Sequence, residues 1–171
     1  MADRQDIEKV VRDAYAARAA KDLDAIARLV MPNAEFQLAG SPATFPAAAR
    51  AQGSAQLVAA VKSLIETFDF LEQTMVESVI EGNKAAVLWR VKLKHNPTDQ
   101  VFDTELFDLW TIRDGRVASL VQFCDTALVA NIMRNLCTVI AGHIGGGYAI
   151  GKRLESERQS EMHHQACTAR A

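Results

Sequence analysis

The sequence predicts a single α+β domain, because the apolar pattern changes once along the chain from the period of a helix to that of a strand. Apolar side chains recur every three or four positions up to about residue 65, and every second position from Phe70 to Cys124. Helices followed by a run of strands are typical of segregated layers rather than alternating parallel units. The length of 171 residues, 49% of them hydrophobic, suffices for one core.

We expect three helices in the first part of the chain, at residues 3–20, 22–31 and 54–65. Asp22 and Ser54 stand at the starts of the second and third, where a side-chain oxygen can cap the first turn. Pro32 ends the second helix, because proline lacks the N–H group that a helix interior needs. The prolines and glycines of residues 39–53 predict a loop before the third helix.

Five strands are expected, at residues 35–38, 70–80, 85–95, 101–113 and 116–124. Short turns join the last four, which indicates an antiparallel meander. A further helix is expected at residues 126–140, and Asp125 is either its cap or an acid at the mouth of a cavity. We therefore divide the chain into a main domain, residues 1–130, and a C-terminal helical extension with a polar tail, residues 131–171.

Composition excludes several classes of function. The formal net charge of −2 leaves no basic stripe for a phosphate backbone, so we expect no nucleic-acid partner. No apolar run approaches the ~20 residues that span a bilayer, and the polar start does not resemble a signal peptide, so we expect a cytoplasmic protein without a membrane partner. Three widely spaced cysteines are typical of reduced thiols rather than of a disulfide framework.

We expect no cofactor and no metal. The segment from Gly146 to Lys152 has the spacing of a phosphate-binding loop, but Arg153 stands where that loop needs Ser or Thr. His163, His164 and Cys167 lie in a polar tail without a second ligand cluster nearby.

Three stretches resemble the nuclear-transport-factor-2-like superfamily and, more narrowly, its SnoaL-like, ketosteroid-isomerase-related branch. They are residues 20–26 (AKDLDAI), residues 32–36 (PNAEF), and residues 110–129, which begin WTIRDGRV and end QFCDTALV. The resemblance covers roughly residues 5–130. It implies a cone-shaped, cystatin-like roll, in which helices and a curved antiparallel sheet enclose an apolar pocket, and frequent dimerisation through the outer sheet face. Members include isomerases, dehydratases, polyketide cyclases, epoxide hydrolases and domains that only bind or assemble.

The catalytic positions of these relatives are only partly kept. The tyrosine of ketosteroid isomerases falls on Ala14, with Tyr15 one residue further, and their proton-transferring carboxylate falls on Leu38. The Arg-x-Asp of epoxide hydrolases reads Arg90-Val91-Lys92, and their last acid reads Gln122. Neither mechanism carries over by resemblance alone.

The last hairpin suggests which side chains face the pocket. A three-residue loop at 113–115 pairs Ile112 with Arg116 and places alternate residues on one face, whereas a two-residue loop moves them to the other face. That face carries Leu106, Asp108, Trp110, Ala118, Leu120, Gln122 and Cys124. By resemblance it lines the cavity, with Asp108 at the position of an acidic oxyanion donor and Arg90 as its partner.

Two functional hypotheses remain open. In the first, a cofactor-independent isomerase, cyclase, dehydratase or hydrolase acts on a hydrophobic small molecule by proton transfer, with Asp108, Arg90 and Tyr15 as catalytic residues. Its substrate contacts are Trp110, Gln122, Leu106, Leu120, Leu38 and Phe36. In the second, the domain is a non-catalytic ligand carrier or dimerising scaffold, and Asp108 forms a structural ion pair.

Two side chains and one surface carry further alternatives. Arg90 belongs either to the pocket or to a solvated cationic face, and Tyr15 either enters the cavity or is partly exposed. The opposite face of the hairpin is too apolar for water, so we expect a homodimer through it. Its residues are Phe107, Leu109, Val117, Val121 and Phe123.

Overall fold

The computed structural model describes residues 3–41 and 50–133. Its elements are α1 (Arg4–Ala19), α2 (Leu23–Leu29), β1 (Val30–Leu38), β2 (Arg50–Gln52), α3 (Ser54–Thr67), β3 (Phe68–Glu81), β4 (Lys84–His95), β5 (Gln100–Arg113) and β6 (Arg116–Cys124). Residues 126–133 form a further helical segment. The predicted α+β class is confirmed, whereas the tail features expected from residue 134 onwards lie outside the described residues.

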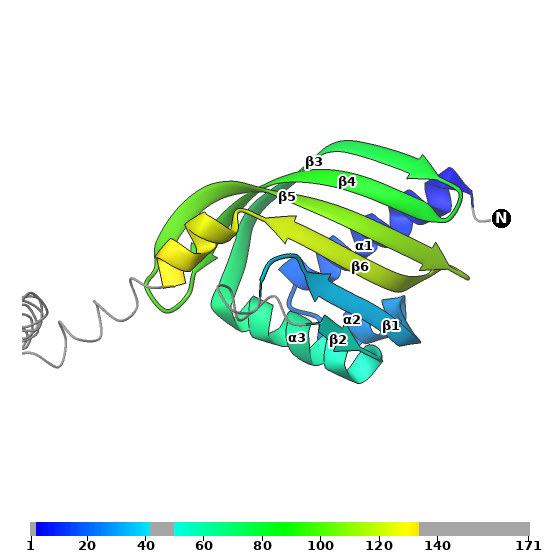
Figure 1. Cartoon of the computed structure of the whole chain (residues 1–171), viewed down its shortest axis with the longest axis horizontal. Coiled ribbons are helices and arrows are strands. Elements are labelled where there is room, and N and C mark those ends of the chain that lie inside the picture. Colours follow the sequence, from blue (N-terminus) through cyan, green and yellow to red (C-terminus); the bar gives the residue numbers. More distant parts are fainter. Residues whose placement is uncertain (1–2, 42–49, 134–171) are drawn as a thin grey trace, which may run out of the picture. The chain divides into compact units, whose positions relative to one another are not determined.

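The six strands form one curved sheet in the order β2-β1-β6-β5-β4-β3 (Figure 1). Neighbouring strands are antiparallel except β1 and β6, which run parallel. The helix α1 lies against one face of the sheet and contacts β3, β4 and β5, while α2 and α3 pack beside β1. The helices and the bent sheet thus enclose the core, as expected for a cone-shaped roll.

The core forms where the apolar stripe of α1 meets the inner sheet face. Ile7, Val11 and Tyr15 recur at helical spacing and are buried. On β4 every second side chain is buried from Ala85 to His95, the period expected of a strand with one face in the core. Each fully buried Ile or Val contributes roughly 1.5–3 kcal/mol relative to an exposed one, so this contact fixes α1 on the sheet.

Two of the three predicted helix caps are confirmed. Asp22 accepts a hydrogen bond from the Ala25 amide at 2.8 Å, and Asp125 accepts one from the Leu128 amide at 2.9 Å. Asp125 is therefore a helix cap. The third prediction is wrong, because α3 starts at Ser54 itself and its cap is Gly53, whose φ of 84° suits glycine.

The segment between α2 and α3 differs from the prediction in two ways. The strand β1 starts at Val30, so Pro32 lies inside a strand rather than closing a helix. The short strand β2 lies in the expected loop and pairs with β1, Phe36 opposite Ala51. A three-residue edge strand carries too little period-two pattern to be recognised in a sequence.

The β5–β6 hairpin reaches the expected face by a different register. Its turn has two residues, Asp114 and Gly115, with φ of 49° and 68°, as a type I′ turn requires. Arg113 therefore pairs with Arg116, not Ile112 with Arg116 as predicted. A bulge then leaves Ala118 without a partner.

Because of the bulge, every later side chain on β6 lies on the face predicted for it. Trp110 pairs with Leu120, Asp108 with Gln122 and Leu106 with Cys124. The predicted register would pair these three residues with Ala118, Leu120 and Gln122, so each of the three partners is wrong by two residues while the shared face is as expected. At the start of β6 the prediction fails: Val117 is buried, although it was expected on the outer face.

Candidate functional site

Three side chains from α1, β5 and β6 form a closed hydrogen-bonded triangle in the core. The Tyr15 hydroxyl group donates to Asp108 Oδ2 at 2.7 Å. Gln122 Nε2 donates to Asp108 Oδ1 at 2.9 Å and to the Tyr15 hydroxyl oxygen at 3.1 Å. Asp108 and Gln122 meet because they are directly paired across the hairpin, and Tyr15 reaches them from the helix above.

Asp108 has no exposed surface. Burial raises the pKa of its carboxyl group to about 6, because a charge is disfavoured away from water. The hydrogen bonds from Tyr15 and Gln122 and the positive charge of Arg18 oppose this rise. The Trp110 indole also lowers this pKa, although its Nε1 has no acceptor in hydrogen-bond geometry. Asp108 therefore changes charge near neutral pH.

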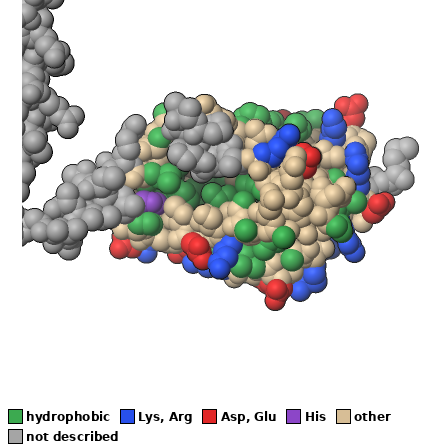
Figure 2. Space-filling model, turned by 60° about the horizontal axis from the view of Figure 1, so that its bottom comes forward, with side chains coloured by type: hydrophobic (Ala, Val, Ile, Leu, Met, Phe, Trp, Pro, Cys, Tyr) green, Lys and Arg blue, Asp and Glu red, His purple; other side chains and the backbone are tan. Residues whose placement is uncertain are grey.

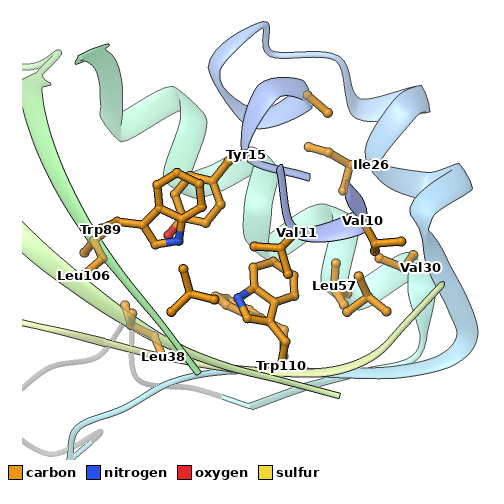
Figure 3. Packing of buried hydrophobic residues seen from close by; sticks show 14 of the residues in the cluster. Val10, Val11, Tyr15, Ile26, Val30, Leu38, Leu57, Trp89, Leu106 and Trp110 are labelled. Carbon is orange, nitrogen blue, oxygen red and sulfur yellow. The ribbon is translucent and has the colours of Figure 1, made fainter. Parts of the chain in front are cut away.

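Tyr15 is fixed by aromatic contacts. Its ring stacks on that of Trp89 with centroids 3.9 Å apart, as Figure 3 shows, and Phe70 meets its edge. Burial and the nearby Asp108 charge raise the pKa of the hydroxyl group well above 10.0. Tyr15 thus stays protonated and acts as a hydrogen-bond donor.

Arg18 lies one helical turn after Tyr15 and extends the network. Its Nη1 donates to Gln122 Oε1 at 3.2 Å, and its guanidinium group lies 4.5 Å from the centre of the Phe70 ring. Its Nε is buried and has no hydrogen-bond partner. Burial lowers the pKa of Arg18, yet a guanidinium group remains charged in proteins.

Two cavities adjoin this network. The first has a volume of about 50 Å³ and lies among Tyr15, Arg18, Trp110, Gln122 and apolar side chains of α2, α3 and β1. The second, of about 110 Å³, is lined by Arg18, Gln122 and Cys124, by Ser63, Leu64 and Thr67 near the end of α3, and by apolar side chains of the sheet and of the last helical segment. Arg18, Leu64 and Gln122 border both. On one face of the molecule, hydrophobic side chains gather in a hollow with charged side chains around its margin (Figure 2).

The structure places most predicted site residues around these cavities. Trp110, Leu120 and Phe36 line the first, Leu38 and Leu106 the second, and Gln122 both. Tyr15 lines the first cavity, while Asp108 lies behind Tyr15 and Gln122 and touches neither space. No Asp or Glu among the described residues lines either cavity, so a ligand there meets Asp108 only through its partners.

The predicted pairing of Arg90 with Asp108 is wrong. Arg90 is exposed, and its Nη2 lies 3.5 Å from Glu105 Oε1, across the β4–β5 pair. Its neighbours Trp89 and Val91 take the inner positions of β4, so strand alternation turns Arg90 outward.

The cation beside Asp108 is Arg18, which was not among the predicted site residues. A signal was present, because residues three apart share a helix face and Tyr15 was already a candidate. Its long side chain carries a charge from the end of α1 into the core.

Comparisons with known proteins agree with this architecture. The sequence profile of the SnoaL-like domain matches residues 11–120. The chain belongs to the SnoaL-like family, within the NTF2-like superfamily. No curated protein matches the chain.

Several solved structures share the fold. An NTF2-like protein from Burkholderia thailandensis is 25% identical, with a TM-score of 0.61 over 74% of this chain and 96% of that one. One from Burkholderia xenovorans is 22% identical, with a TM-score of 0.61 over 74% and 95%. An LEH-like epoxide hydrolase from M. tuberculosis is 13% identical, with a TM-score of 0.59 over 82% and 96%.

The SnoaL-like site of this chain offers hydrogen-bond donors to a small apolar space. In the described part of the chain no group of three His, Cys, Asp or Glu side chains could hold a metal ion. None of the described helices is long and apolar enough to span a membrane. The titratable group of the site is the buried carboxylate of Asp108, which is hydrogen-bonded to Tyr15 and Gln122 at the cavity wall.

Proposed function

We propose that this SnoaL-like domain binds a hydrophobic small molecule in the two cavities, with Tyr15, Arg18 and Gln122 as its polar contacts. The observation that carries the proposal is the convergence of these three groups on space lined mostly by aliphatic and aromatic side chains, with Ser63, Thr67 and Cys124 in the second cavity as the exceptions. Apolar cavities with a few convergent polar groups are the usual form of a small-molecule site.

The volumes limit the size of the ligand. A cavity of roughly 150 Å³ holds a benzene ring, and each of the two here is smaller, at about 50 and 110 Å³. A ligand with six carbon atoms therefore needs both, and reaches from one to the other past Arg18.

A short neutral amide tests the proposal. Hexanamide has an apolar chain and one polar end, and its binding is measured by NMR shift titration of the labelled protein. Ala14→Leu adds three carbon atoms at the wall of the first cavity and should abolish the binding. Ala16→Leu, at an exposed position of the same helix, is the matched control. Equal binding by both variants would place the ligand elsewhere and overturn the proposal.

A proton-transfer enzyme is the second candidate, favoured by the 2.7 Å hydrogen bond from Tyr15 to Asp108. In such a reaction the Tyr15 oxygen takes a proton from the ligand while Asp108 takes the proton of the Tyr15 hydroxyl group. The exchange of the α-protons of cyclohexanone in D₂O tests this step. Exchange should rise as Asp108 ionises near pH 6 and disappear in Asp108→Asn. Exchange no faster than in buffer would rule out the proton-transfer reaction, and only the binding function would stand.

We also propose that two copies of the chain pair through the outer sheet face. Phe107, Leu109 and Phe123 are 43%, 40% and 46% exposed there, and the rings of Phe107 and Phe123 contact each other. Aromatic side chains exposed together are typical of an interface.

A further inference from the structure

Two side chains that line the first cavity carry buried N–H groups with no acceptor in hydrogen-bond geometry among the described residues. They are Nε of Arg18 and Nε1 of Trp110. The Trp110 indole lies close enough to Asp108 to lower the pKa of that carboxyl group, so Arg18 is the clearer exception. Buried polar groups in proteins are nearly always hydrogen-bonded, and a ligand that satisfies this donor has to supply oxygen or another acceptor.

The charge of Arg18 also lacks a direct counter-ion. Some exposed arginines of this chain pair with carboxylates, for example Arg12 with Glu8 and Arg90 with Glu105. Arg18, by contrast, contacts the neutral amide of Gln122 and the ring of Phe70, and no ion pair joins it to another described residue. Asp108 acts on it through its charge, but the Asp108 oxygens accept hydrogen bonds from Tyr15 and Gln122 instead. Arg18 is partly withdrawn from water, and a cation in such a position is normally paired.

Arg18 borders both cavities. Among the described residues only Arg18, Leu64 and Gln122 line both spaces, and Arg18 is the charged one. Apolar residues of α2 and α3, among them Ile26, Leu57 and Val61, form the rest of the first cavity. A molecule with a charged end at Arg18 can therefore place an apolar body beside these side chains.

We propose that the ligand of this site is a small apolar carboxylic acid, bound as its carboxylate anion by Arg18. This proposal rests on the proposed binding function and names the chemical class of its ligand. Arg18 supplies the charge, Trp110 a further donor, and the aliphatic walls hold the hydrocarbon part. A guanidinium group suits this role because it binds carboxylates with charge-assisted hydrogen bonds.

The test compares hexanoate with hexanamide, which has the same chain length and a carbonyl oxygen but no charge. NMR titration at pH 7.5 should show hexanoate binding at least about tenfold more tightly to the wild-type protein. Arg18→Gln should reduce this ratio to near one, while Arg18→Lys, which keeps the charge, should retain part of it. Arg12→Gln, on the exposed face of the same helix, should leave the ratio unchanged.

The outcomes separate the two proposals. If hexanamide binds, fails to bind to Ala14→Leu, and equals hexanoate in affinity, the binding function stands and the carboxylate proposal is overturned. A preference for hexanoate that persists in Arg18→Gln also overturns it. The wild-type comparison needs no variant, so a poorly folded Arg18→Gln does not prevent the decision. Binding of neither probe counts against both proposals.

Discussion

The Tyr15 hydroxyl group donates a hydrogen bond of 2.7 Å to the carboxylate of Asp108, 93 residues later in the chain. This contact joins α1 to β5 inside the core, where Asp108 has no exposed surface. The pair therefore links the stability of the fold to the charge of one carboxyl group.

Asp108 should make the protein less stable as the pH rises from about 4 to above 6. The pKa is about 6 in the folded protein and about 3.9 in an unfolded chain. Between these values the folded state holds more protons than the unfolded state, so its stability falls with increasing pH. The difference in pKa corresponds to roughly 2–3 kcal/mol at pH 7.5.

Asp108→Asn isolates this effect, because asparagine does not ionise. Urea unfolding at pH 5 and pH 7.5 should show a free energy of unfolding that falls with pH in the wild type relative to the variant. His95 is present in both proteins and acts in the opposite direction, since burial lowers its pKa and its contribution to stability is lost as pH falls. Parallel pH profiles for the two proteins would contradict a raised pKa of Asp108.

Tyr15→Phe should destabilise the protein by about 1–3 kcal/mol at pH 7.5, the range for leaving a buried polar partner unsatisfied. The variant retains the ring that stacks on Trp89, so the loss belongs to the hydroxyl group. The loss should be smaller at pH 5, because Asp108 is then mostly protonated and a neutral carboxyl group gains less from the hydrogen bond than a carboxylate does. Chemical denaturation at both pH values measures it, and an equal loss at both would mean that the hydroxyl group does not stabilise the Asp108 charge.

The sequence predicts the side chains of this site better than their partners. Strand alternation alone places Asp108 and Trp110 on one face of β5. Gln122 on β6 shares that face only for a register of the right parity. The pairing itself depends on a two-residue turn and a bulge at Ala118, which leave no clear mark in the apolar pattern. The wrong turn length and the missed bulge each shift the predicted pairing by one residue. Together they shift it by two, so the predicted face agrees with the structure although the register does not.

Arg90 and Arg18 show the other limit of sequence reasoning. Alternation on β4 does not state which face is inside, and only packing against α1 decides it. Helix spacing associates Arg18 with Tyr15, but a single arginine near a helix end is usually solvated. The strand β2 was missed for a related reason, since three residues acquire their structure from pairing with β1.

Deleting Ala118 should preserve the pairing of Asp108 with Gln122, because this residue is the unpaired one in the bulge. Without it Ile112 still pairs with Val117 and Thr111 with Ser119, so a regular ladder replaces the bulge and Gln122 stays on the inner face. We expect the variant to retain cooperative thermal unfolding and the pH profile of the wild type. Ala118→Ser keeps the residue count and serves as the control. Loss of cooperative unfolding in the deletion variant alone would show that the bulge itself is needed.

The proposed pairing of two copies predicts a dimer at micromolar concentration in sedimentation velocity. Phe123→Asp should shift the protein towards the monomer, because it places a charge among the exposed side chains of Phe107 and Leu109. Leu71→Asp changes an equally exposed residue on β3, at 49% exposure, and should leave the dimer intact. Since Phe123 is turned away from the core, circular dichroism should show the same fold in all three proteins. A wild-type monomer under these conditions would refute the interface. Dissociation of the dimer by both substitutions would mean that the interface extends over the sheet as far as β3.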